Sequence, residues 1–260
     1  MIKVVICGAA GRMGQKIISI IQEEKDIKLV GAIEGSHNPM LGTRISPDVK
    51  IIHNLEEVAP LADVVVDFTS PKATLDFLAV LSRLKKPFII GTTGFTEDEI
   101  KNIKFITQNF PCLLASNMSI GMNLLFRLVR DVAPILGDSY DVEIVEAHHN
   151  RKKDAPSGTA MTLAEEIAKA LNRNVKEDLV YGRKGNVGER LPKEIGIHSI
   201  RGGDIVGDHT VIFAGHGERI ELTHRASSRD TLARGVVRAI RFMATAKTGF
   251  YDMQDVLGLK

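Results

Sequence analysis

The chain has 260 residues and a net charge of +2, with 44% hydrophobic and 25% charged residues. This length suits one large domain or two smaller ones, and so small a charge excludes the strong bulk field of a general nucleic-acid or anionic-membrane binder. No apolar run approaches the roughly 20 residues of a membrane-spanning helix, and the two cysteines support neither a disulfide framework nor a metal site. We expect a cytoplasmic globular protein without a bound metal.

The first half of the chain alternates short Val/Ile/Leu-rich strands with helices, which is typical of a parallel sheet covered on both faces. The predicted strands are 2–7, 27–33, 49–53, 63–67, 87–90 and 112–115. The predicted helices are 12–24, 72–84 and 96–108. This order indicates a Rossmann-type α/β domain over residues 1–119, with a dinucleotide as its expected ligand.

The pattern changes after Asn117. A long helix is followed by segments in which apolar and polar residues alternate, as in an open sheet with one covered face. We predict helices at 122–136 and 161–171, strands at 142–147, 195–200, 209–213 and 219–224, a hairpin turn at 215–218 and a long surface excursion at 173–193. Residues 120–228 would thus form an α+β domain with an open mixed sheet. The helix 229–247 opens a segment, 229–260, that is expected to return to the first domain.

A glycine-rich loop, Gly8-Ala9-Ala10-Gly11-Arg12-Met13-Gly14, lies directly between the first strand and the first helix. Glycines let the backbone approach a pyrophosphate, which the N–H groups of a helix start can bind. Ala9 stands where the usual G-x-G-x-x-G fingerprint has its first glycine, but the strand-loop-helix context still predicts a nucleotide site.

Glu34 follows the loop by about 20 residues, at the end of the second strand, where a carboxylate accepts the hydroxyls of the adenosine ribose. Gly35 comes next and cannot clamp a 2′-phosphate as an arginine would. We therefore expect NADH, NADPH or both as cofactor, with NADH used at least as well as NADPH. Three further strand ends could form a nicotinamide slot: Phe68-Thr69-Ser70, Gly91-Thr92-Thr93-Gly94 and Ala115-Ser116-Asn117-Met118.

The most distinctive segment is His148-His149-Asn150-Arg151-Lys152-Lys153-Asp154-Ala155-Pro156-Ser157-Gly158-Thr159, between a predicted strand and a predicted helix. The helix start and the cations suit a carboxylate or phosphate, and histidine exchanges protons near neutral pH. A solvated basic surface with structural histidines is the alternative. The Pro-Ser-Gly-Thr helix start behind three cations favours a site for a small acidic substrate.

Taken together, these segments resemble the dihydrodipicolinate reductase family of bacterial lysine and diaminopimelate biosynthesis. The resemblance runs almost end to end. It includes Glu146-Ala147-His148-His149, Arg201-Gly202-Gly203-Asp204-Ile205-Val206-Gly207-Asp208-His209-Thr210, Thr223-His224-Arg225-Ala226-Ser227-Ser228-Arg229 and Gly249-Phe250-Tyr251-Asp252-Met253. It implies an NAD(P)H-dependent reductase that removes water from a cyclic 4-hydroxy dicarboxylate imine and adds hydride to carbon 4.

The resemblance also implies roles for single residues. His148 would be the acid/base and Lys152 a proton donor, while His149, Gly158 and Thr159 would hold the substrate. The matching nucleotide contacts are Gly8, Ala9, Ala10, Gly11, Arg12, Met13, Glu34, Gly91, Thr92, Thr93, Ala115, Ser116, Asn117 and Met118. The family often has an arginine after the ribose-binding acid, from which Gly35 departs. A homotetramer built through the open sheet is implied as well. Arg151 receives no role, and Lys153 is expected on the surface.

Two other functions remain open on the sequence. The first is another NAD-dependent dehydrogenase, of aspartate or a semialdehyde, against which the 148–159 segment argues. The second is a non-catalytic NAD-sensing regulator, in which Arg234, Arg238 and Arg241 on one face of the last helix would contact nucleic acid. A net charge of +2 gives little general affinity of that kind. We expect a small dicarboxylate as the partner, and neither nucleic acid nor a membrane.

Overall fold

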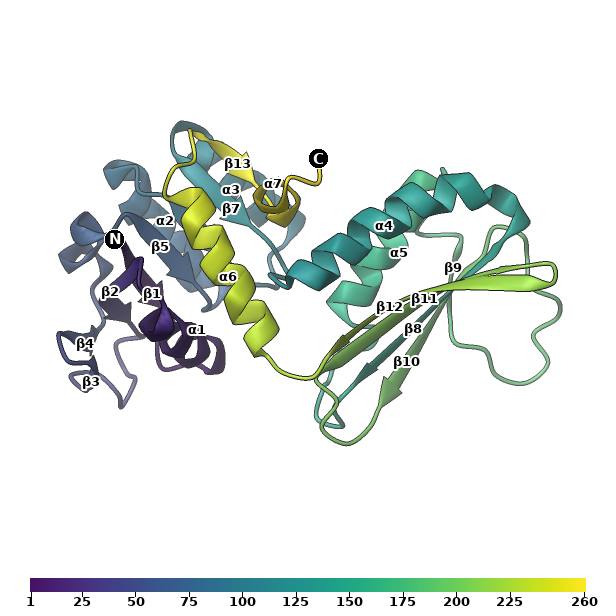
Figure 1. The fold of residues 1–260 in the computed structure, drawn as a ribbon, viewed down its shortest axis with the longest axis horizontal. Coiled ribbons are helices and arrows are strands. Elements are labelled where there is room, and N and C mark those ends of the chain that lie inside the picture. The colour runs from purple at the N-terminus through teal and green to yellow at the C-terminus, as the bar shows by residue number, and fades with distance from the viewer. The chain divides into compact units, whose positions relative to one another are not determined.

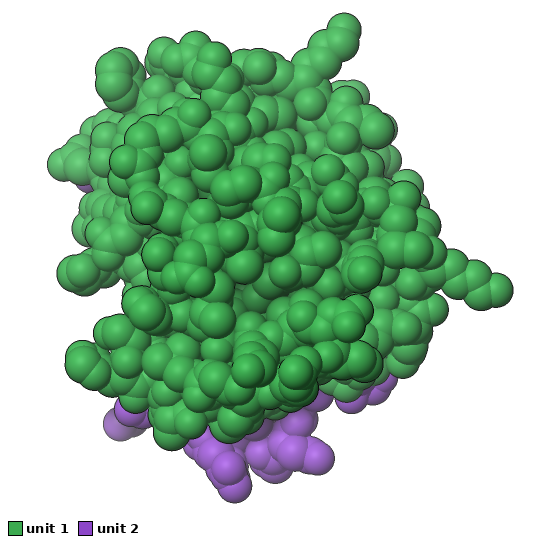
Figure 2. Space-filling model, turned by 90° about the vertical axis from the view of Figure 1, so that its left-hand side faces the viewer, with its two compact units in different colours: residues 1–120, 229–260 green, residues 121–228 purple.

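The computed structural model describes residues 1–260 and divides them into two units, which Figure 2 colours separately. Unit 1 comprises Met1–Ile120 and Arg229–Lys260, and unit 2 comprises Gly121–Ser228. The C-terminal segment therefore belongs to the same unit as the N-terminal strands. Each unit has one sheet, with an apolar core on each face of the sheet in unit 1 and on one face of the sheet in unit 2.

The sheet of unit 1 has the strand order β13-β7-β6-β5-β1-β2-β4-β3 and is parallel except for the β3–β4 pair. Its strands are β1 (Ile2–Cys7), β2 (Ile27–Ile33), β3 (Arg44–Ser46), β4 (Val49–Ile52), β5 (Val64–Asp67), β6 (Phe88–Ile90), β7 (Pro111–Leu114) and β13 (Gly249–Tyr251). From the central pair β1 and β5, successive strands of the chain are added towards one edge of the sheet and then towards the other, so the strand order reverses at this pair. Open α/β sheets bind ligands at the carboxyl ends of the strands where the order reverses.

Helices cover both faces of this sheet (Figure 1). Because successive side chains of a strand point to opposite faces, β1 serves two cores: Val4 and Ile6 pack with α1 and α6, and Val5 and Cys7 with α2. The helices are α1 (Arg12–Glu23), α2 (Pro71–Leu84), α3 (Glu97–Ile106), α6 (Asp230–Met243) and α7 (Met253–Leu257), with 3-10 turns at Leu55–Glu57, Ala59–Leu61 and Thr107–Asn109.

Two of the three arginines on the exposed face of α6, Arg234 and Arg241, lie near carboxylates of unit 1. Arg241 donates to both carboxylate oxygens of Asp26, at 2.8 Å each, and to Glu24 at 2.6 Å. Arg234 lies 3.9 Å from a carboxylate oxygen of Glu23. Arginines paired in this way leave less free charge for nucleic acid than the sequence suggests, which weakens the regulator hypothesis.

The sheet of unit 2 has the order β12-β11-β8-β10-β9 (Figure 1). Its strands are β8 (Asp141–His148), β9 (Leu179–Tyr181), β10 (Ile195–Arg201), β11 (Gly207–Gly215) and β12 (Glu218–Ala226). β10 runs parallel to β8 and β9, whereas β11 is antiparallel to β8 and β12. Helices α4 (Ile120–Leu136) and α5 (Gly158–Ala170) pack on one face, and a 3-10 turn at Gly137–Ser139 follows α4. The predicted mixed sheet with one covered face is confirmed.

The segment predicted as a surface excursion, 173–193, is more ordered than expected. It contains β9, and Arg183 and Arg190 tie it to Glu143 of β8 with N–O distances of 2.9 to 3.1 Å. His198 Nε2 lies 2.7 Å from the same carboxylate. Burial raises the pKa of Glu143, but the hydrogen bonds from these three side chains outweigh it and hold the pKa at about 2. Strands β3, β9 and β13 have three residues each, too few to show a periodic pattern, and α7 was missed as well.

None of the helices has the length and apolarity that crossing a membrane requires. The structure also contains no group of three or more His, Cys, Asp or Glu side chains placed to hold a metal ion.

Candidate active site

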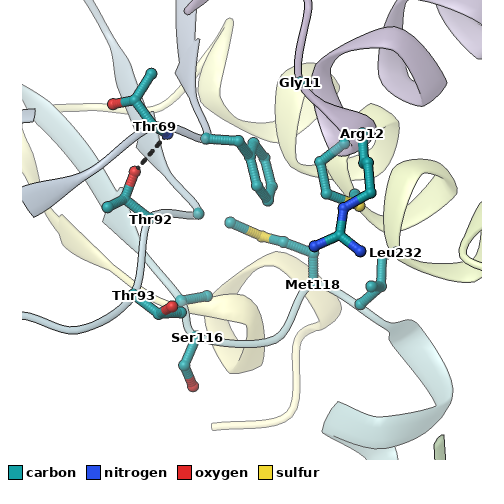
Figure 3. Close-up of a pocket in the computed structure, with 12 residues that line it drawn as sticks. Gly11, Arg12, Thr69, Thr92, Thr93, Ser116, Met118 and Leu232 are labelled. Atoms are coloured by element: carbon teal, nitrogen blue, oxygen red, sulfur yellow. Dashed lines mark hydrogen bonds between the residues drawn. The ribbon is translucent and has the colours of Figure 1, made fainter. Parts of the chain in front are cut away.

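A cavity of about 420 Å³ lies at the carboxyl ends of the strands of unit 1, beside the point where the strand order reverses. Figure 3 shows the residues that line it: Gly11, Arg12, Met13, Phe68, Thr69, Gly91, Thr92, Thr93, Ala115, Ser116, Met118 and Leu232. The loops after β1, β5, β6 and β7 thus meet at one edge, as the sequence predicts. Leu232 of α6 was not predicted, because only the fold brings the C-terminal helix to this edge.

The glycine loop brings the chain close to itself at the start of α1. Gly11 N–H donates to the Gly8 carbonyl at 3.0 Å. A Cβ on Gly14 would lie 2.0 Å from the same carbonyl oxygen, so only glycine fits there. No side chain caps the N-terminus of α1, which leaves its first N–H groups available to the phosphates of a nucleotide.

Glu34 does not line the cavity; hydrogen bonds hold its carboxylate beside the glycine loop. Its Oε1 accepts from the Ala10 N–H at 2.7 Å, and its Oε2 accepts from Asn38 Nδ2 at 3.1 Å. The carboxylate is therefore positioned at the end of β2, where a ribose is expected. Of the other predicted contacts outside the lining, Gly8 and Ala9 lie within the loop, and Asn117 follows β7, its Oδ1 accepting from Ser119 N–H at 2.9 Å.

A buried carboxylate organises the opposite side of the cavity. Asp67, at the end of β5, accepts hydrogen bonds from the hydroxyls of Thr69, Thr74 and Thr92. The Thr92 hydroxyl oxygen also accepts from Thr69 N–H at 2.9 Å, which joins the loops after β5 and β6 (Figure 3). Burial raises the pKa of Asp67 although the threonine hydroxyls lower it. Asp67 was not among the predicted site residues, although an aspartate that ends a wholly apolar strand was the available signal.

In unit 2, four strands place polar residues side by side on one face of the sheet. The register pairs Ser199 of β10 with Glu146 of β8, Glu146 with His209 of β11, and His209 with His224 of β12. Residues paired in this way point to the same face. The next row holds Arg201 beside His148.

Glu146 is fully buried and accepts hydrogen bonds on both oxygens. Arg201 donates to both, at 2.7 and 2.8 Å, and the Ser157 N–H donates to Oε1 at 3.1 Å. His148 Nδ1 lies 2.6 Å from Oε2. Burial raises the pKa of Glu146, but Arg201, Ser199 and His148 outweigh it and hold the pKa at about 2. Glu146 is therefore a carboxylate at neutral pH.

The start of α5 is tied to the same cluster. Ser157 caps the helix by accepting from Ala160 N–H at 3.1 Å, and its hydroxyl lies 3.2 Å from His209 Nε2. The His148 and His209 rings meet edge to face with centroids 5.2 Å apart. Burial, and next the charge on His148, lower the pKa of His209 to about 4. Gly158 and Thr159 begin the helix here, and a Cβ on Gly158 would meet open space.

Lys152 is partly buried in the loop that follows β8, and its ammonium group forms a 2.9 Å ion pair with Asp154. His149 Nδ1 accepts from Arg151 N–H at 3.2 Å. Burial lowers the pKa of His148 although Glu146 raises it. The side chains of Arg151 and Lys153 are exposed, as expected for Lys153.

This arrangement can bind a carboxylate and exchange protons. A family model described as "Dihydrodipicolinate reductase, N-terminus" matches residues 2–118, and one described as "Dihydrodipicolinate reductase, C-terminus" matches residues 121–257. The chain belongs to the dihydrodipicolinate reductase family. The resemblance drawn from the sequence is confirmed.

Full-length relatives agree with this assignment. The chain is 51% identical to the 4-hydroxy-tetrahydrodipicolinate reductase of Syntrophotalea carbinolica and 47% identical to that of Syntrophus aciditrophicus, and all of each chain is covered. It is also similar to a dipicolinate-bound dihydrodipicolinate reductase from Paenisporosarcina sp. TG-14, with a TM-score of 0.79, 26% identity and 98% of both chains covered. The members of this reductase family thus match the whole fold.

Four residues of the unit 2 cluster were not among the predicted site residues: Glu146, Ser157, Arg201 and His209. Each lies in a segment that carries the family resemblance, which was the only signal for them. Their partners are remote in the sequence, and an alternating strand pattern does not distinguish a buried glutamate from a solvated one. Only the strand register brings them together.

The buried His209 makes folding stability depend on pH. Its pKa is lowered to about 4 in the folded protein, so its contribution is complete above pH 6.5, the ordinary value, and is lost as the pH falls to 4. At about 1.4 kcal/mol per pH unit this amounts to roughly 3 kcal/mol. Urea unfolding at pH 7 and pH 5 should show a smaller pH dependence in His209→Gln than in the wild type. His216→Gln, at an exposed hairpin position of the same unit, should keep the wild-type dependence, and an unchanged dependence in His209→Gln would contradict the assignment.

Proposed function

We propose that the protein reduces 4-hydroxy-tetrahydrodipicolinate to tetrahydrodipicolinate, with loss of water and with NAD(P)H as reductant, in lysine and diaminopimelate biosynthesis. The observation that carries the proposal is the cluster of His148, Glu146 and Arg201 beside the start of α5. It combines a proton-exchanging group with a helix N-terminus in a chain of the reductase family. An aspartate or semialdehyde dehydrogenase has no observation in its favour here.

Unit 2 would hold the substrate, which carries two carboxylates. The first turn of α5, with Gly158 and Thr159, offers N–H and hydroxyl groups, and helix N-termini favour anions. His149 lies in the preceding loop and would contact the same molecule. The relative from Paenisporosarcina has dipicolinate, a compact dicarboxylate, bound. A substrate of that size and charge suits this set of residues.

Unit 1 would hold the nucleotide through the glycine loop, Glu34 and the cavity residues Gly91–Thr93 and Ala115–Met118. Their arrangement fits a dinucleotide: an uncapped helix start for the pyrophosphate, a positioned carboxylate for the ribose and a cavity at the strand ends for the nicotinamide. When bound, NAD(P)H would supply the hydride that goes to carbon 4 of the ring.

The protons would be handled by His148 and Lys152. Loss of the 4-hydroxyl group as water requires a proton on the leaving oxygen and removal of one from the neighbouring carbon. Addition of hydride to the conjugated imine then requires the uptake of one proton. His148 is neutral above its lowered pKa and can accept a proton, whereas the Lys152 ammonium group, paired with Asp154, can donate one.

We further propose that the active protein is a homotetramer built through the open face of the unit 2 sheet. No helix of unit 2 packs on this face, and it presents apolar side chains such as Val145, Ile200 and Ile212 beside charged ones. Ile200 is 50% exposed. Sheet faces of this kind are commonly covered by another chain.

Purified enzyme should oxidise NADH and NADPH when hydroxy-tetrahydrodipicolinate is generated enzymatically in the assay. NADH should be used at least as well as NADPH, because Gly35 offers no cation to a 2′-phosphate. Gly35→Arg should raise kcat/KM for NADPH relative to NADH. No oxidation of either nucleotide would contradict the proposed function, and a strong NADPH preference of the wild type would contradict the role of Gly35.

His148→Ala and Lys152→Ala should each lower kcat by roughly 100-fold or more, the usual scale for proton-transfer groups. Initial rates at saturating NADH measure this. Lys153→Ala removes a neighbouring cation that is exposed and should keep kcat within about twofold of the wild type. Near-normal kcat in either of the first two variants would remove that residue from the mechanism.

Sedimentation equilibrium should give the mass of four chains. Ile200→Glu should shift the mass towards smaller species, since it places charges in the proposed interface. Phe105→Glu alters an apolar side chain of unit 1 that is 70% exposed and should leave the mass unchanged. A monomeric wild type, or a tetramer in Ile200→Glu, would contradict this interface.

A further inference from the structure

We propose that Glu146 and Arg201 form a positioning pair that keeps the proton of neutral His148 on Nδ1, leaves Nε2 free to accept a proton, and links His148 to Lys152. The inference rests on the proposed function and deepens it. Neither residue was assigned a role by the sequence analysis. Their role follows from the contacts that surround the Glu146 carboxylate.

The hydrogen bond between His148 and Glu146 runs from the imidazole to the carboxylate. Both oxygens of Glu146 accept from Arg201, and Oε1 also accepts from Ser157 N–H. A carboxylate in this setting has no proton to give. The 2.6 Å contact with His148 therefore has Nδ1–H as donor, which places the unshared electron pair of neutral His148 on Nε2.

The other ring nitrogen of His148, Nε2, lies beside a glycine. Gly207, at the start of β11, lies opposite this atom, and a Cβ there would come within 3.1 Å of Nε2. Glycine therefore keeps this side of the ring uncrowded. Because Nδ1 is occupied by Glu146, Nε2 is the ring atom through which His148 can exchange protons.

Arg201 connects the surroundings of His148 with those of Lys152. Arg201 Nη2 also donates to the backbone carbonyl of Asp154 at 2.6 Å. The side chain of Asp154 forms the ion pair with Lys152. One guanidinium thus holds the carboxylate that orients His148 and the loop residue that pairs with Lys152. The spacing of the two proton-handling groups depends on it.

The chain contains a matched control for this cluster. Glu143, three residues earlier on β8, also pairs with two arginines and a histidine: Arg183, Arg190 and His198. It points to the opposite face of the same sheet. A mutation that neutralises Glu143 disrupts a comparable network of ion pairs that does not contact His148.

The experiment compares Glu146→Gln with Glu143→Gln, each checked to have the same mass in solution as the wild type. Glutamine keeps the shape but offers only one accepting oxygen and adds an NH₂ group, so it cannot satisfy Arg201 and orient His148 together. Glu146→Gln should lower kcat about 100-fold, as expected when an acid/base histidine loses its orienting partner, and KM for NADH should stay within about twofold. Glu143→Gln should keep the wild-type kcat.

Two further measurements separate positioning from a general structural role. ¹⁵N NMR of histidine-labelled wild type, above the pKa of His148, should show protonated Nδ1 and bare Nε2, with a shift towards protonated Nε2 in Glu146→Gln. In a His148→Ala background, Glu146→Gln should lower kcat by clearly less than it does in the wild type, because the part of its effect that passes through His148 is already absent.

The outcomes are decisive in each case. A proton on Nε2 of neutral His148 in the wild type would overturn the inference, even if Glu146→Gln failed to fold. So would an equal loss of kcat on mutation of Glu146 with and without His148. If the wild type reduces no substrate, the proposed function fails instead, while the NMR measurement still tests the orientation of His148.

Discussion

A buried carboxylate must have its charge satisfied by nearby donors, and in unit 2 this requirement draws three segments together around Glu146. Moving a carboxylate out of water costs several kcal/mol, which only close and well-aligned partners offset. Arg201 supplies two hydrogen bonds from β10, Ser157 one from the start of α5, and His148 one from the end of β8. The start of α5, with Gly158 and Thr159, is thereby held beside the histidine. The geometry of the proposed substrate site follows from satisfying one charge.

Unit 1 uses a second buried carboxylate, with different partners and a different electrostatic result. Asp67 is surrounded by threonine hydroxyls and has no cation among its hydrogen-bond donors, so burial prevails and its pKa is raised. Glu146 is equally buried but has Arg201 beside it, and its pKa is lowered. The pKa values of the two buried carboxyl groups thus shift in opposite directions. The full positive charge of Arg201 compensates for the lost hydration of Glu146, whereas neutral hydroxyls compensate for that of Asp67 only in part. Asp67 joins two loops that line the cavity of unit 1. Glu146 instead influences the protonation of its neighbour His148.

The two clusters also divide the work of the proposed reduction. The cavity of unit 1 is formed at strand ends, where loops can approach a ligand while the buried strands stay rigid. The cluster of unit 2 lies at the end of a sheet face that α4 and α5 cover, so its polar groups lie next to an apolar core. On the open face, Glu143 has a similar set of partners, two arginines and a histidine. These contacts hold the 182–194 segment against β8 and do not reach the proposed site. Position on one or the other face of β8 decides which of the two glutamates can act on the site.

The sequence by itself determined the larger features of this protein. Periodicity located nearly all strands and helices longer than three residues, because long regular elements repeat their apolar positions. The glycine loop, Glu34 and the 148–159 segment predict a nucleotide region and a substrate region, because those chemistries need particular residues at short spacing. The tertiary structure alone decided the partners of Glu146 and Asp67, the approach of Leu232 to the cavity of unit 1 and the strands β3, β9 and β13. Glu146 and Arg201 lie far apart in the chain, and the parallel register of β8 and β10 brings them together. Such pairings are a property of the folded sheet, and no local pattern in the chain encodes them.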